Sequence, residues 1–99
     1  MIVGIGLFQF KEESSDKAMN LLLEHMEQEK KSKGILRGYV ARSTDSSAFI
    51  LIYTEWESEE SRREMHKMLR ETPGIEQRFS EIMKLMEGEP LFSTFEVMD

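Results

Sequence analysis

The side chains of this sequence that could take part in chemistry are few, and two of them stand close along the chain. His66 follows Trp56 by ten residues. Because imidazole titrates near neutral pH, His66 is the best candidate for a general base. Trp56 could stack on an aromatic ligand, or it could be a structural anchor in the core. The chain has no cysteine and two histidines, which excludes thiol chemistry, disulfides and histidine-rich metal sites.

Three further polar side chains could share one face of a pair of strands. Arg37 and Tyr39 point to the same side of one predicted strand, and Tyr53 lies on the next strand along the chain. On a cavity wall they would bind a small molecule, because pockets combine an apolar floor with a few polar groups. In a dimer interface the same residue types would form a polar seam. The sequence leaves both interpretations open.

The second histidine, His25, lies beside the apolar stripe of a predicted helix, with Glu29 one turn further along. Two ligands make a poor metal site. We therefore expect neither a metal ion nor another cofactor.

These candidates must be positioned by four strands and three helices, which the hydrophobic periodicity and the turn residues predict. The strands are expected at 2–10, 35–43, 48–55 and 91–98. The helices are expected at 15–33, from the N-cap Ser58 to the break at Pro73, and from Ile75 to Met86. This βαββααβ order is typical of the ferredoxin-like α+β fold, an antiparallel four-stranded sheet with helices on one face.

The predicted strand 48–55 is apolar on both faces, and so is the last strand. Helices can cover only one face of such a sheet, and a large exposed apolar face would be prone to association. A small ligand or a second copy of the chain could cover it. We expect a homodimer formed by sheet-to-sheet packing across a two-fold axis.

The charge balance limits the partners. The chain has 19 acidic and 13 basic residues and a net charge of −6, which argues against nucleic-acid binding because that requires a basic surface. The apolar start of the chain is too short to span a membrane and resembles no export signal. With 99 residues, the chain is expected to form a single cytoplasmic domain over residues 1–99.

One segment resembles a known family. Residues 49–60 form an apolar strand that ends in Trp56-Glu57-Ser58, and an acid-rich helix start and His66 follow. This pattern is similar to the third strand of antibiotic biosynthesis monooxygenase (ABM) domains. The resemblance implies a dimeric α+β barrel. It also implies a small monooxygenase that oxidises a hydrophobic or aromatic molecule without a cofactor, with Trp56 in the pocket and His66 as the base.

The sequence departs from two patterns within that family. Haem-degrading members carry an Asn on the first strand and a Trp in the second helix; here the first strand has no Asn and Met65 stands near the Trp position. The polyketide oxygenases carry an Asn four residues before the strand-end Trp, where this chain has Ile52. The alternative is therefore kept open that the protein is a non-catalytic homodimer, either structural or small-molecule-binding.

Overall fold

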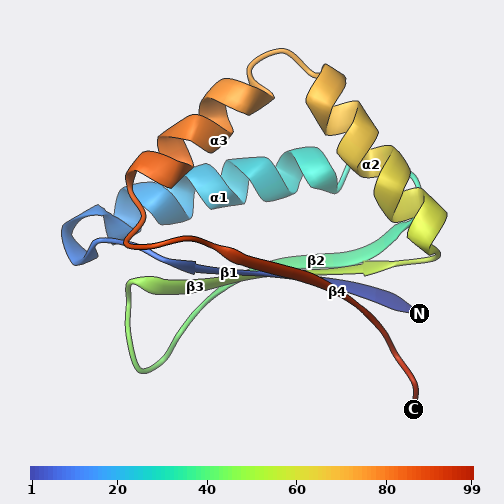
Figure 1. The fold of residues 1–99 in the computed structure, drawn as a ribbon, viewed down its shortest axis with the longest axis horizontal. Coiled ribbons are helices and arrows are strands. Elements are labelled where there is room, and N and C mark those ends of the chain that lie inside the picture. The colour runs from blue at the N-terminus through green and yellow to red at the C-terminus, as the bar shows by residue number, and fades with distance from the viewer.

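Three helices lie on one face of a four-stranded antiparallel sheet in the computed structural model, which describes residues Met1–Asp99 (Figure 1). The strands are β1 (Ile2–Gln9), β2 (Ile35–Arg42), β3 (Phe49–Trp56) and β4 (Leu91–Glu96). The helices are α1 (Ser15–Glu29), α2 (Glu59–Glu71) and α3 (Ile75–Lys84), and a short 3-10 turn, η1 (Glu12–Ser14), precedes α1.

The strand order β2-β3-β1-β4, with every neighbour antiparallel, confirms the predicted ferredoxin-like α+β fold. Ser58 is the N-cap of α2, as predicted, and its side chain accepts a hydrogen bond from the backbone N–H of Ser61. The first helix ends at Glu29, four residues before the predicted end. The chain then turns through Gly34, whose φ is +84° and where an added Cβ would lie 2.3 Å from the Ser61 hydroxyl oxygen.

An irregularity at the start of β2 changes which residues face the helices. Ile35 pairs with Trp56 and Arg37 pairs with Glu55, so Leu36 is an extra residue in a β-bulge and is 53% exposed. Simple alternation along the strand would place Leu36 on the same face as Gly38 and Val40, and the bulge removes it from that face. Beyond the bulge the alternation is regular.

The core consists of two clusters on the helix side of the sheet. The larger cluster joins β1, β3, α1 and α3 through Phe8, Phe10, Ala18, Leu22, Ile50, Ile82 and Met86. The smaller cluster joins the end of β3 to α2 and α3 through Trp56, Met65, Leu69 and Ile75. Figure 1 shows that α1 runs along the sheet, whereas the turn between α2 and α3 lies farther from it.

The opposite face of the sheet is covered by no helix (Figure 1). In the strand register, Tyr39, Tyr53 and Ile5 lie side by side on this outer face, and Leu51 lies beside Leu7. Tyr39 is 52% exposed. The expectation of a second apolar face is therefore confirmed in this chain. No helix is both long enough and apolar enough to cross a lipid bilayer.

Trp56 is fully buried, and its single polar atom has a partner. The indole Nε1 donates to the hydroxyl oxygen of Thr54 at 2.9 Å, and that hydroxyl donates to the carbonyl oxygen of Gly4 at 3.4 Å. A Cβ on Gly4 would lie 2.7 Å from the same hydroxyl oxygen. The close neighbour that requires a glycine at this position is thus Thr54 of β3.

We expect Thr54→Val to destabilise the protein by about 1–3 kcal/mol, because the buried indole N–H would lose its acceptor and could not reach water. Urea denaturation followed by Trp56 fluorescence measures the change. Thr44→Val, in the exposed turn between β2 and β3, is the matched control and should leave the free energy of unfolding nearly unchanged. Equal stability of the Thr54 variant and the wild type would contradict a role for this hydrogen bond.

Candidate functional site

A cavity of about 740 Å³ opens between the helices and the inner face of the sheet. Its strand wall is formed around two residues without side chains, Gly4 and Gly6. A Cβ on Gly6 would lie 3.1 Å from the ring of Phe92 and 3.2 Å from the ring of Phe8. The strands contribute hydroxyl groups from Thr54 and Thr94 but no ionisable side chain.

Aromatic rings form a continuous wall from β1 to α1. Phe8 and Phe92 meet edge to face with centroids 5.5 Å apart, and Phe92 lies 6.3 Å from Phe79 of α3. The next ring is His25 of α1, whose centroid lies 6.2 Å from that of Phe79. Such a wall suits a flat apolar molecule, because aromatic rings pack favourably in edge and offset arrangements.

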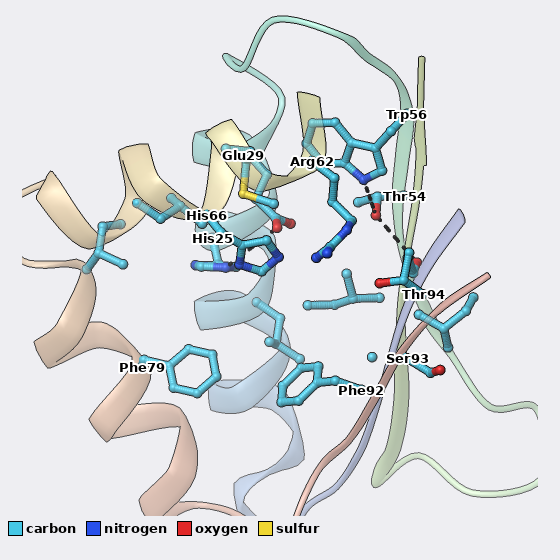
Figure 2. Close-up of a pocket in the computed structure, with 18 of the residues that line it drawn as sticks. His25, Glu29, Thr54, Trp56, Arg62, His66, Phe79, Phe92, Ser93 and Thr94 are labelled. Atoms are coloured by element: carbon cyan, nitrogen blue, oxygen red, sulfur yellow. Dashed lines mark hydrogen bonds and ion pairs between the residues drawn. The ribbon is translucent and has the colours of Figure 1, made fainter. Parts of the chain in front are cut away.

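His25 and Glu29 are the most deeply buried ionisable side chains of the cavity, with 8% and 7% of their surfaces exposed. His25 Nε2 lies 4.0 Å from Glu29 Oε1, which is too long for a hydrogen bond. Neither the other ring nitrogen, Nδ1, nor the other carboxyl oxygen, Oε2, has a hydrogen-bond partner. Both side chains project from α1 toward the cavity beside His66 (Figure 2).

Burial decides the protonation of this pair. The pKa of His25 is lowered to about 4, first by burial and then by the charges of Arg78 and His66. Burial raises the pKa of Glu29 to about 7. At neutral pH the imidazole is therefore uncharged, and the carboxyl group titrates close to neutrality.

The helix α2 adds cationic side chains to the opposite part of the cavity. Arg62 points into it from α2, and its guanidinium also pairs with Glu59 (Figure 2). His66 remains more exposed than His25. Its pKa is lowered by partial desolvation and then by the charges of Arg62 and Arg70. His66 is therefore neutral at physiological pH and able to accept a proton.

The sequence predicted five site residues, and two of them lie at this cavity in the structure. Trp56 and His66 both line it. Tyr39, Tyr53 and Arg37 lie on the outer face of the sheet, with the two tyrosine rings 6.0 Å apart. The Tyr53 hydroxyl donates to Glu55 Oε2 at 2.9 Å, and this hydrogen bond is the main cause of the raised pKa of Tyr53.

His25 and Glu29, which the sequence analysis considered only as a poor metal site, also line the cavity. Their signal is the spacing of the buried face of α1, where Ala18, Leu22, His25 and Glu29 follow one another at intervals of four, three and four residues. Leu23, although apolar, lies outside this buried face and is 46% exposed. No three histidine or acidic side chains are grouped so that they could hold a metal ion.

The pair gives a pH dependence that can be measured. In the unfolded state His25 becomes protonated as pH falls below 6.5, whereas in the folded state it becomes protonated only at about pH 4. Between these pH values the protonated unfolded state is favoured, so His25 lowers the free energy of unfolding on acidification. Glu29 acts in the opposite sense, because its folded form takes up a proton at about pH 7 and its unfolded form only near 4.5. In the wild type the two groups therefore change the free energy of unfolding in opposite directions as pH falls.

We expect Glu29→Gln to lose stability more steeply than the wild type between pH 6.5 and 4, by up to about 3 kcal/mol, because only the His25 contribution remains. Urea denaturation at a series of pH values measures this slope. Glu27→Gln, an exposed carboxylate on the same helix, should keep the wild-type slope. Parallel profiles for all three proteins would contradict the protonation states assigned to the pair.

Comparison with known proteins identifies the family. The family model described as antibiotic biosynthesis monooxygenase matches residues 1–68, which include Trp56, Arg62 and His66. A search of curated proteins finds no match.

Three solved structures with a similar fold illustrate the range of relatives. A Nitrosomonas europaea protein assigned to antibiotic biosynthesis monooxygenases is 14% identical, with a TM-score of 0.84 and full coverage of both chains. SnoaB, a cofactor-independent oxygenase from Streptomyces nogalater, is 11% identical, with a TM-score of 0.81 over 99% of this chain and 93% of its own. A conserved protein from Methanosarcina mazei is 18% identical, with a TM-score of 0.81 over 95% of this chain and 89% of its own. At these identities the likeness concerns the fold. The match of the family model to more than half of the sequence shows that this chain belongs to the antibiotic biosynthesis monooxygenase family.

Proposed function

We propose that the protein is a cofactor-independent monooxygenase that oxidises a hydrophobic aromatic molecule in the cavity between the helices and the sheet. The observation that carries the proposal is the combination of an aromatic wall with neutral imidazoles in one cavity. Family membership supports it, as does the similar fold of SnoaB, which is a cofactor-independent oxygenase.

The reaction needs a base and an activated substrate. The base removes a proton from a CH₂ group that adjacent aromatic rings acidify, and the carbanion passes one electron to molecular oxygen. The two radicals combine to a carbon-bound peroxide, which loses water and leaves a ketone. One oxygen atom enters the product and the other leaves as water with both hydrogens of the CH₂ group, so no external reductant is required.

In this proposal His66 is the base and Trp56 forms part of the substrate-binding wall. His66 suits the role because its pKa is lowered, so that the unprotonated ring predominates at neutral pH. The Arg62 guanidinium on the same helix would stabilise negative charge on the substrate. Trp56 has its indole N–H bound to Thr54, which leaves its contribution to the cavity apolar.

One observation favours a second candidate function, a small-molecule-binding protein without catalysis. Ile52 lines the cavity at the position where polyketide oxygenases of the family carry an Asn. An apolar side chain there supplies burial and no polar contact to a reacting group. Binding without oxygen consumption would favour this candidate.

We expect the wild type to accelerate oxygen uptake with dithranol, a phenolic anthrone that carries an activated CH₂ group. His66→Ala should reduce the rate at least about tenfold, because a positioned base contributes about 10²–10⁴-fold. An oxygen electrode measures the rate, and isotopically labelled molecular oxygen should appear as one atom in the product. Lys67→Ala, the exposed neighbour on α2, is the control variant and should retain the wild-type rate.

An unchanged rate in His66→Ala would remove His66 from the mechanism. The absence of any enzyme-dependent oxygen uptake, together with measurable ligand binding, would replace the oxygenase by the binding protein.

We further propose that two copies, each a single domain of residues 1–99, pair through the outer face of the sheet. The outer face offers an apolar centre around Leu51 and Leu7, with Tyr39, Tyr53 and Arg37 at its side. Aromatic residues and arginine are enriched in interfaces. The three polar residues would then form the dimer seam, which is one of the two interpretations that the sequence left open.

Light scattering should give a mass about twice 11.6 kDa at micromolar concentration. Leu51→Glu should shift the protein toward the monomer, because each copy would bury an unpaired carboxylate in the interface. Leu23→Glu places the same charge on an exposed apolar position of α1 and should leave the mass unchanged. A monomeric wild type would reject the proposed interface.

A further inference from the structure

Two polar atoms in the cavity wall lack the partners that buried polar atoms ordinarily have. His25 Nδ1 and Glu29 Oε2 are both buried without a hydrogen bond, and each belongs to a residue more than nine-tenths buried. Buried polar groups are nearly always paired, because an unpaired one costs free energy of folding. Both residues border the cavity, so a bound molecule could provide the missing partner.

We propose that His25 and Glu29 form an acceptor pair for a hydroxyl group on the aromatic ligand, with His25 Nδ1 contacting the hydroxyl and Glu29 holding the opposite nitrogen of the ring. The choice of an aromatic ligand rests on the proposed function. The roles of the two residues rest on their own geometry. His25 would be a catalytic residue, and Glu29 a positioning residue that acts through it.

The geometry of the ring supports this division of roles. Glu29 faces the Nε2 side of the imidazole, so Nε2 carries the hydrogen and Nδ1 is free to accept one. Nε2 and Oε1 lie 4.0 Å apart, and the proposal requires that they approach to hydrogen-bond distance when the ligand binds. Phe79 packs against the His25 ring and Phe92 lies next to Phe79, so a flat ligand along this wall would bring its edge near Nδ1.

The proton balance of the pair is complete within the site. When the ligand hydroxyl gives its proton to Nδ1, Nε2 can give its proton to the Glu29 carboxylate. The imidazole changes tautomer and stays neutral, while the negative charge moves from the carboxylate to the ligand oxygen. No imidazolium forms, which matters because burial opposes a charged His25.

The charged groups around the pair favour this transfer of charge. From α2, Arg62 and Arg70 line the cavity together with His66, and α3 contributes Glu76. Also from α3, Arg78 lowers the pKa of His25, and its Nε lies 4.0 Å from Glu24 of α1. The strands contribute no ionisable group to the cavity wall. The cations on α2 would therefore stabilise the resulting phenolate.

The proposal can be tested by binding alone, with naphthol and its methyl ether as a matched pair of ligands. The ether cannot donate a hydrogen bond and adds one methyl group, so the comparison between wild type and variants isolates the hydrogen bond. Trp56 is the one tryptophan and lines the cavity, so its indole N–H resonance in nitrogen-labelled protein reports occupancy. Above pH 7, where Glu29 is ionised, the wild type should bind naphthol about tenfold more tightly than the ether.

This preference should decrease as pH falls below about 7, because a protonated Glu29 can no longer take up the Nε2 proton and accepts only a weaker, uncharged hydrogen bond from it. It should fall to about twofold or less in Glu29→Gln and in His25→Phe, while the affinity for the ether changes little, since neither variant removes the aromatic wall. The exposed Glu27→Gln should keep the full preference. Thermal melting of each variant verifies that it is folded.

Equal affinities of the wild type for naphthol and its ether would overturn the proposal. So would a Glu29→Gln protein that is folded and retains the full preference, or a wild type to which neither ligand binds. This test and the test of the proposed function can fail independently. A preference for naphthol without oxygen uptake would reject the oxygenase and support the proposed role of His25 and Glu29. Oxygen uptake without the preference would support the oxygenase and reject that role.

Discussion

The burial of Trp56 is the interaction on which the arrangement of the site depends. Its ring lies at the end of β3 and packs against Met65 and Leu69 of α2 and Ile75 of α3. A fully buried indole is stable there because Thr54 accepts its N–H, and Thr54 fits because Gly4 has no side chain. The helices are thereby supported by a large side chain at one end of the sheet, and by the larger core cluster on α1, α3 and the strands. Side chains of both clusters contribute to the cavity wall.

The cavity has a polar character that differs from wall to wall. The strands supply an aromatic and hydroxyl surface, α2 supplies the guanidinium groups of Arg62 and Arg70, and α1 supplies a buried imidazole and carboxyl group. A fold shared by many proteins does not determine such a distribution, which belongs to the particular side chains. The family assignment therefore sets the reaction class to be tested, while His25, Glu29, Arg62 and His66 are ionisable side chains that line this cavity.

The fold could be predicted from the sequence because periodicity and turn residues act locally. The strand alternation and the Ser58 cap are examples. Two features of the structure could not be predicted in this way. The bulge at Leu36 depends on how Ile35 and Arg37 pair with β3, which no local pattern specifies. His25 and Glu29 are polar residue types that are usually exposed, so residue type alone predicts the wrong environment for them. Only their spacing from Ala18 and Leu22 indicates the buried face of α1. The tyrosines were assigned correctly to one face of the sheet, but which face borders a cavity depends on the tertiary structure.

The unpaired atoms of His25 and Glu29 have an evolutionary consequence. Apolar residues of similar volume at these two positions would fill the same space without an unsatisfied polar atom, and the folded protein would gain stability. A mutant library selected for heat resistance would therefore accumulate substitutions at these positions first. Descendants under selection for ligand turnover would retain the two polar residues. Under the proposed role of the pair, the residues at these two positions of α1 would separate relatives that kept the ligand contact from relatives that kept only the fold.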